Sequence, residues 1–225
     1  MSDFPEYLID GPSGDEAIAT FLFAHGAGAG MDHAFMTTVA QGLAQEGIRV
    51  IRFDFPYMIK RREDGKKRPP DRQPKLLLDF QRHIQAFSHE KLVIGGKSMG
   101  GRMASVMVTD FANEFPEVEN CASVVRGVAC LGFPFHPPGK PENFRGEHLK
   151  TMPVPTLILQ GERDTFGTRA EVEAWQYADS VTTAFLPDGD HGFKPRKASG
   201  HTEVGNIQLA IQQLAAFIKE CVGAQ

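Results

Sequence analysis

The side chains best suited to chemistry are Ser98, Asp164 and His191, which lie far apart in the sequence. A serine hydroxyl is a weak nucleophile at neutral pH. It needs a base to take its proton and a third group to orient that base. Serine, histidine and aspartate are the residue types that meet these needs in nucleophilic acyl chemistry. We therefore ask whether the chain can bring these three side chains together.

Ser98 lies in the pattern Gly-x-Ser-x-Gly, between Gly96 and Gly100. An apolar, β-branched run precedes it and a helical pattern follows, which is the order of a nucleophile elbow. The turn strains the backbone of its serine, so its neighbours must be small. Amides at the start of the following helix favour negative charge, and the amide of Met99 is the first of them. We predict that Ser98 is the nucleophile and Met99 an oxyanion donor; the alternative is a glycine-rich turn without chemistry.

His191 follows the last predicted strand, in the segment Asp-Gly-Asp-His-Gly-Phe, and is the candidate general base. Asp164 follows the preceding strand and is the candidate that orients the imidazole, with Glu162 in reserve. Asp188 and Asp190 are too close to the histidine in sequence to approach it from a neighbouring strand. The resulting order along the chain is serine, aspartate, histidine, as in α/β-hydrolases.

A glycine-rich segment, His25 to Gly30, follows the apolar run 17–25. We predict that the amide of Ala27 is the second oxyanion donor and that His25 is structural, bonding to the loop. A flexible helix entry is one alternative. A phosphate-binding loop is a weak one, because the full dinucleotide spacing and an acidic ribose partner are missing.

Aromatic residues follow two of the predicted strands and are candidate substrate contacts. Lys97 precedes the nucleophile, but adjacent side chains point apart in such a turn, so we propose no Ser–Lys pair. The irregular segment from 132 to about 151 is short, which predicts a minimal lid or none. The predicted substrate-binding residues are Phe133, Phe135, His136 and Phe193.

The elements that must position these residues form an alternating pattern. Short apolar runs occur at 17–25, 49–53, 91–97, 124–131, 156–160 and 182–186. Between them lie stretches with helical spacing, which indicates an α/β fold with a mostly parallel sheet and helices on both faces. Candidate site residues follow strand ends, where such sheets bind ligands. We expect one domain over residues 1–225.

Several details of these elements are also predicted. Asp32 is a candidate cap for the helix that includes Met36 to Leu43, and Gly47 ends it. Thr168 and Glu171 have the spacing of a capping box. The helix after the elbow is expected to bury a stripe that extends to Phe111.

Residues 56–74 break the alternation and are predicted to form a long loop. Basic residues between 60 and 72 are interleaved with acidic residues and prolines. A solvated surface loop with mixed charges is the favoured interpretation. The alternative is a rim that attracts an anionic substrate or orders over the site.

Composition excludes several classes of function. The net charge of −4 argues against a nucleic-acid-binding protein, which would carry an excess of basic residues. The three cysteines have no metal-ligand spacing, and no histidine pair has metalloprotease spacing, so we predict neither metal nor cofactor. No apolar run could span a membrane, and the N-terminus lacks a signal pattern. We expect a cytoplasmic protein with a small-molecule acyl substrate and no membrane or nucleic-acid partner.

These motifs resemble the α/β-hydrolase superfamily, in particular its dienelactone hydrolase-like branch. Four segments are closer still to small hydrolase-like proteins related to the third subunit of the non-specific-lethal chromatin complex. The segments are His25–Gly28, Phe55–Met58, Arg68–Pro70 and Gly95–Arg102. The resemblance implies an eight-stranded sheet with one antiparallel strand, a Ser-Asp-His triad and no cofactor. This chain is short of one N-terminal strand, which leaves about seven.

The leading hypothesis is a serine hydrolase that cleaves a small ester, thioester or related acyl compound. A second hypothesis is a non-enzymatic interaction module on the same fold. A third is an acyltransferase that uses the same triad and passes the acyl group to an alcohol or amine.

Overall fold

A computed structural model describes residues 6–115 and 117–224. Seven strands form one sheet in the order β1-β3-β2-β4-β5-β6-β7. Only β1 runs antiparallel to its neighbour, β3, and the remaining pairs are parallel. The predicted strand number and mostly parallel order are therefore confirmed. The strands are β1 (Leu8–Asp10), β2 (Thr20–Ala24), β3 (Arg49–Phe53), β4 (Leu92–Lys97), β5 (Gly127–Leu131), β6 (Thr156–Gly161) and β7 (Val181–Leu186).

The central strands read as continuous apolar runs because both faces of the sheet are covered. Every residue of β2, β5 and β6 is buried. Alternate side chains of a strand point to opposite faces. Phe21 and Phe23 accordingly belong to one layer of the core, while Leu22 belongs to the other.

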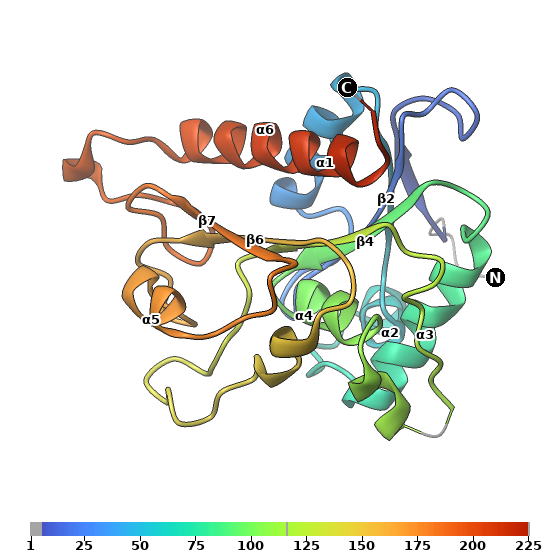
Figure 1. Cartoon of the computed structure of the whole chain (residues 1–225), viewed down its shortest axis with the longest axis horizontal. Helices are drawn as coiled ribbons and strands as arrows, with labels where there is room; N and C mark the ends of the chain where they lie inside the picture. Colours follow the sequence, from blue (N-terminus) through green and yellow to red (C-terminus); the bar gives the residue numbers. More distant parts are fainter. Residues whose placement is uncertain (1–5, 116, 225) are drawn as a thin grey trace.

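Helices lie on both faces of the sheet (Figure 1). The two on one face, α1 (Ala34–Gln45) and α6 (Glu203–Cys221), pack against each other and carry one core layer. The opposite face is covered by α2 (Pro56–Asp64), α3 (Gln73–Ala86), α4 (Met99–Val106) and the short α5 (Arg169–Ala174). Three 3₁₀ segments complete the elements: η1 (Asp110–Glu114), η2 (Glu147–Thr151) and η3 (Lys197–Ser199).

The largest departure from the sequence prediction is α2, which occupies part of the expected loop 56–74. Pro56 opens this helix at a position where its missing N–H is no loss. Gly65 ends it with a left-handed φ of 70°. The irregular segment is therefore shorter than predicted and covers residues 65–72.

Helix ends differ in two further places. His33, not Asp32, caps α1, because its ring nitrogen accepts the N–H of Phe35. The helix after the elbow ends at Val106, so Phe111 lies in η1 and is 38% exposed instead of buried on a helix face. The capping box of Thr168 with Glu171 is present, as predicted.

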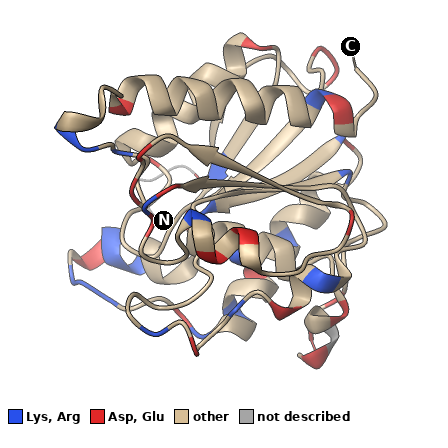
Figure 2. Ribbon diagram, turned by 60° about the vertical axis from the view of Figure 1, so that its left-hand side comes forward, with Lys and Arg blue, Asp and Glu red and all other residues tan. Residues whose placement is uncertain are grey.

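Basic and acidic residues are interspersed over the outer helices and loops (Figure 2). In the basic segment, Arg62 pairs with Asp32 and Asp54, and Arg68 pairs with Asp64. Arg62 is thus held against the buried Asp54, whereas the Arg68–Asp64 pair is partly exposed. In the described part of the chain, no helix is both long enough and apolar enough to cross a bilayer.

Candidate active site

Ser98 sits on a sharp turn between β4 and α4. Its φ of 51° lies in the left-handed region, which residues with a side chain rarely adopt. Space around the turn is very small. A Cβ on Gly96 would lie 2.4 Å from the carbonyl carbon of Gly100, and a Cβ on Gly100 would lie 2.4 Å from the carbonyl oxygen of Ala24. Glycine at both positions is therefore a steric requirement of this turn.

A continuous chain of hydrogen bonds joins the three polar residues predicted from the sequence. Ser98 Oγ lies 2.9 Å from His191 Nε2, and His191 Nδ1 lies 2.8 Å from Asp164 Oδ2. A carboxylate only accepts, so Nδ1 carries the imidazole hydrogen and Nε2 presents its lone pair to the hydroxyl. An imidazole in this state can take a proton from the serine as the serine attacks a carbonyl.

The carboxylate of Asp164 is completely buried and well anchored. It accepts the side-chain amide of Gln160 at 3.0 Å and the backbone N–H of Phe166 at 2.9 Å, in addition to the imidazole. These bonds satisfy a charge that would otherwise be expensive to bury. Glu162, the reserve candidate, instead accepts the backbone N–H of Asp188 and pairs with Arg169.

The glycine-rich loop lies beside Ser98 and is tied to the core by His25. This imidazole is fully buried, donates from Nδ1 to the carbonyl of Gly26 at 2.7 Å and accepts the N–H of Phe55 at 3.0 Å. Burial lowers the pKa of His25, which keeps the ring neutral. The structural role predicted for this histidine is confirmed. Ala27 lines the cavity next to Ser98, and Met99 opens α4 directly after it.

A cavity of about 420 Å³ lies over Ser98 and His191. One wall is the glycine-rich loop, and another is the start of α1. Phe166 closes a third side, with its ring centroid 4.3 Å from that of His191. The apolar side chains in the lining, which the sequence did not single out as site residues, are Phe35, Met36 and Phe166.

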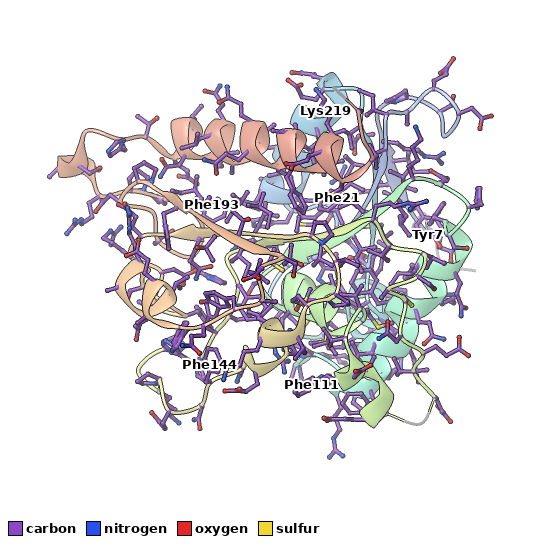
Figure 3. The ribbon with its side chains drawn as sticks, viewed as in Figure 1. Tyr7, Phe21, Phe111, Phe144, Phe193 and Lys219 are labelled. Carbon is purple, nitrogen blue, oxygen red and sulfur yellow. The ribbon has the colours of Figure 1, made fainter. Side chains whose placement is uncertain are left out.

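The four predicted substrate contacts lie elsewhere. Phe133, Phe135 and Phe193 are 0% exposed and His136 is 3% exposed, and none of them lines this cavity. Phe133 and Phe135 pack against each other in one core layer, where Phe135 also contacts Trp175. Phe193 belongs to the other layer, between α6 and the sheet (Figure 3). Their apolar character reflects packing, since a residue after a strand end can turn inward as readily as toward a ligand.

Lys97 supports the loop that carries the histidine. Its Nζ donates to the carbonyl oxygen of His191 at 2.5 Å, between the rings of Phe35 and Phe193. Burial lowers the pKa of this amine to about 8. The Lys97 amine therefore bonds to the backbone of His191, while the Ser98 hydroxyl bonds to the imidazole of the same residue.

Possible metal ligands do not gather at the site or elsewhere in the described residues. Across residues 6–115 and 117–224, no group of three or more His, Cys, Asp or Glu side chains is placed to hold an ion. The hydrogen bond between Ser98 Oγ and His191 Nε2 is an arrangement that can perform proton transfer and nucleophilic attack.

Residues 17–219 match the family described as "Alpha/beta hydrolase domain". Among solved structures, an alpha-beta serine hydrolase homologue from Coxiella burnetii is similar, with a TM-score of 0.66 and 18% identity over 93% of this chain and 89% of its own. Dienelactone hydrolase from Anabaena variabilis has a TM-score of 0.63 and 22% identity, over 94% of this chain and 89% of its own. At these identities the likeness establishes the fold.

A relative by sequence is a probable aldehyde oxidase 1 from Oryza sativa subsp. japonica. It is 27% identical over 155 residues, which is 62% of this chain. The chain spans only 11% of the length of that protein.

Proposed function

The chain belongs to the α/β-hydrolase domain family, and from this premise we propose that it is a serine hydrolase of small ester, thioester or related acyl substrates. The observation that carries the proposal is the unbroken hydrogen-bond chain from Ser98 through His191 to Asp164. Within the family, the four motif segments noted above favour the group related to the third subunit of the non-specific-lethal chromatin complex.

In the proposed reaction, His191 Nε2 takes the proton of Ser98 as the serine oxygen attacks the substrate carbonyl. Asp164 holds the ring in its reactive tautomer and stabilises the imidazolium that forms. The backbone amides of Ala27 and Met99 stabilise the oxyanion. His191 then protonates the leaving group, and water, activated by the same imidazole, hydrolyses the acyl-enzyme.

The cavity supports a small acyl substrate. Its volume of about 420 Å³ lies near the lower end of the usual range for small-molecule sites, about 300–1,000 Å³. Its apolar lining suits an acyl chain or aromatic group. Residues 132–146 contain no helix that covers it, so a substrate can enter without a lid movement.

Two free cysteines, Cys121 and Cys130, are buried, and burial raises the pKa of the Cys121 thiol to about 11. Unreactive thiols of this kind are compatible with a reducing compartment. We therefore place the proposed enzyme in the cytoplasm.

A fluorophosphonate probe followed by peptide mass spectrometry tests the proposal. We expect one adduct, on Ser98, and its loss in Ser98→Ala. Ser105→Ala is the matched control. Ser105 also contacts an imidazole, His148, at 2.8 Å, but both side chains are buried away from the cavity, so labelling should be retained. Equal labelling of the wild type and Ser98→Ala would refute the proposal.

A further inference from the structure

A buried tyrosine lies behind the glycine-rich loop, on the side away from the cavity. Tyr57 belongs to the first turn of α2 and is 2% exposed. Its hydroxyl lies 3.0 Å from the carbonyl oxygen of Ala27 and 3.3 Å from that of Gly26. Burial raises the pKa of this hydroxyl, so it stays protonated and remains a donor.

These two carbonyls belong to the two peptide planes on either side of Ala27. A peptide bond is planar and trans, so its C=O and N–H point in opposite directions. The carbonyl of Gly26 is held toward the core by His25 and Tyr57, which directs the N–H of Ala27 away from them. The cavity, lined by residues 26–29 but by neither His25 nor Tyr57, lies on that other side.

The tyrosine itself is held in a rigid setting. Its ring packs against His25 with centroids 5.8 Å apart. One turn further along α2, Arg61 donates to the carbonyl of Gly28 at 3.1 Å, and Arg62 pairs with Asp54. Side chains of α2 thus hold two consecutive carbonyls of the loop, those of residues 27 and 28.

We propose that Tyr57 is a positioning residue that fixes the direction of the Ala27 amide at the oxyanion site. This inference rests on the proposed hydrolase function. Donors of this kind accelerate a reaction only when they are aimed before the charge develops. Without the hydroxyl, the carbonyl of Ala27 loses this hydrogen bond, so the peptide plane between Ala27 and Gly28 gains freedom to rotate. The plane that carries the Ala27 N–H loses its contact with the hydroxyl but is still held by the bond from His25 to the carbonyl of Gly26.

Tyr57→Phe tests the role because it removes the hydroxyl and keeps the ring. Tyr177→Phe is the matched control. Its hydroxyl donates to the carbonyl of Val172 at 2.9 Å beside α5, outside the cavity lining, so the same chemical change is made away from the site. For both variants, kcat and KM are measured with 4-nitrophenyl acetate, together with the rate of fluorophosphonate labelling.

We expect Tyr57→Phe to lower kcat and the labelling rate about tenfold, with KM within about twofold of the wild type. Loss of a whole oxyanion donor would cost about 10²–10³, and the bond from His25 limits the effect to less than this. Tyr177→Phe should match the wild type. A labelled wild type with equal kcat in Tyr57→Phe and Tyr177→Phe would overturn the positioning role alone. A wild type unlabelled at Ser98 would overturn the proposed function, and this inference with it.

Discussion

Replacing Ser98 with glycine should make the protein more stable than replacing it with alanine. Both substitutions remove the hydrogen bond from the hydroxyl to His191, so that loss cancels in the comparison. Alanine keeps a Cβ at a φ of 51°, and strained backbone of this kind costs about 1–3 kcal/mol. Glycine adopts the same φ freely, at the expense of about 0.4–1 kcal/mol of extra chain entropy in the unfolded state.

The net difference is about 1–2 kcal/mol in favour of Ser98→Gly. For a chain of this size, 1 kcal/mol shifts Tm by about 2–4 °C, so the two variants should differ by about 2–8 °C. Urea unfolding followed by circular dichroism measures the free energy, and calorimetry measures Tm. Both variants should be inactive, which separates the stability effect from catalysis.

Ser105 provides the control for this comparison, because it lies inside α4 with helical backbone. There, glycine should be less stable than alanine by about 1 kcal/mol. The order of the two variants should thus reverse between positions 98 and 105. If Ser98→Gly unfolded at the same urea concentration as Ser98→Ala, or at a lower one, the turn would store no strain and our account of the elbow would be wrong.

Three further substitutions test the surroundings of the site. Burial lowers the pKa of Lys97 in the folded state to about 8, whereas the pKa of a lysine in the unfolded chain is about 10.4. The unfolded state therefore binds more protons between these pH values, so the stability of the wild type should rise with pH there. Lys97→Met lacks this contribution, so its free energy of unfolding relative to wild type should fall by up to about 3 kcal/mol from pH 7 to pH 10. Urea unfolding that gives the same difference between the two proteins at both pH values would contradict this. Gly100→Ala should destabilise the protein by several kcal/mol, because the added Cβ would lie 2.4 Å from the nearest backbone atom. A Cβ added at Gly28 would have no atom within 4 Å, so Gly28→Ala should change stability by less than about 0.5 kcal/mol. Similar Tm values for these two glycine variants would refute the steric argument.

The sheet and the three polar residues were predictable because they depend on local sequence patterns. Continuous apolar runs mark buried parallel strands, and β3 was predicted with its observed bounds, Arg49–Phe53. Residues after strand ends collect at one edge for topological reasons alone. Ser98, Asp164 and His191 each follow a strand end and lie within hydrogen-bond distance at that edge.

The helix α2 was missed because little of its stability is visible in its own sequence. Among its nine residues, only Tyr57 and Met58 are buried, so no apolar stripe develops. Its charged side chains pair with residues outside the helix instead, one of them 30 positions away in the sequence. Arg62 reaches Asp32 and Asp54, and a sequence read locally shows these residues only as scattered charges.

The residues that line the cavity could not be predicted from the sequence either, for a different reason. Position after a strand end does not say whether a side chain turns toward the ligand or into the core. Phe133 turns into the core, whereas Phe166, from the loop that carries Asp164, packs on the imidazole. At the start of α1, Met36 fits the helical stripe, yet it contributes to the cavity because the first turn of that helix reaches the edge of the sheet.

Backbone strain in the described residues is concentrated at the candidate site. The non-glycine residues with positive φ are Ser98, Asp188 and Phe193, and each belongs to the elbow or to the loop around His191. Each is restrained by tertiary contacts: Asp188 pairs with arginines 163 and 196, and Phe193 is completely buried beneath α6. Strained conformations persist only where their surroundings over-determine them. The strained turns therefore hold the hydrogen-bonded Ser98, His191 and Asp164 in place without a bound ligand, as the proposed hydrolase would require.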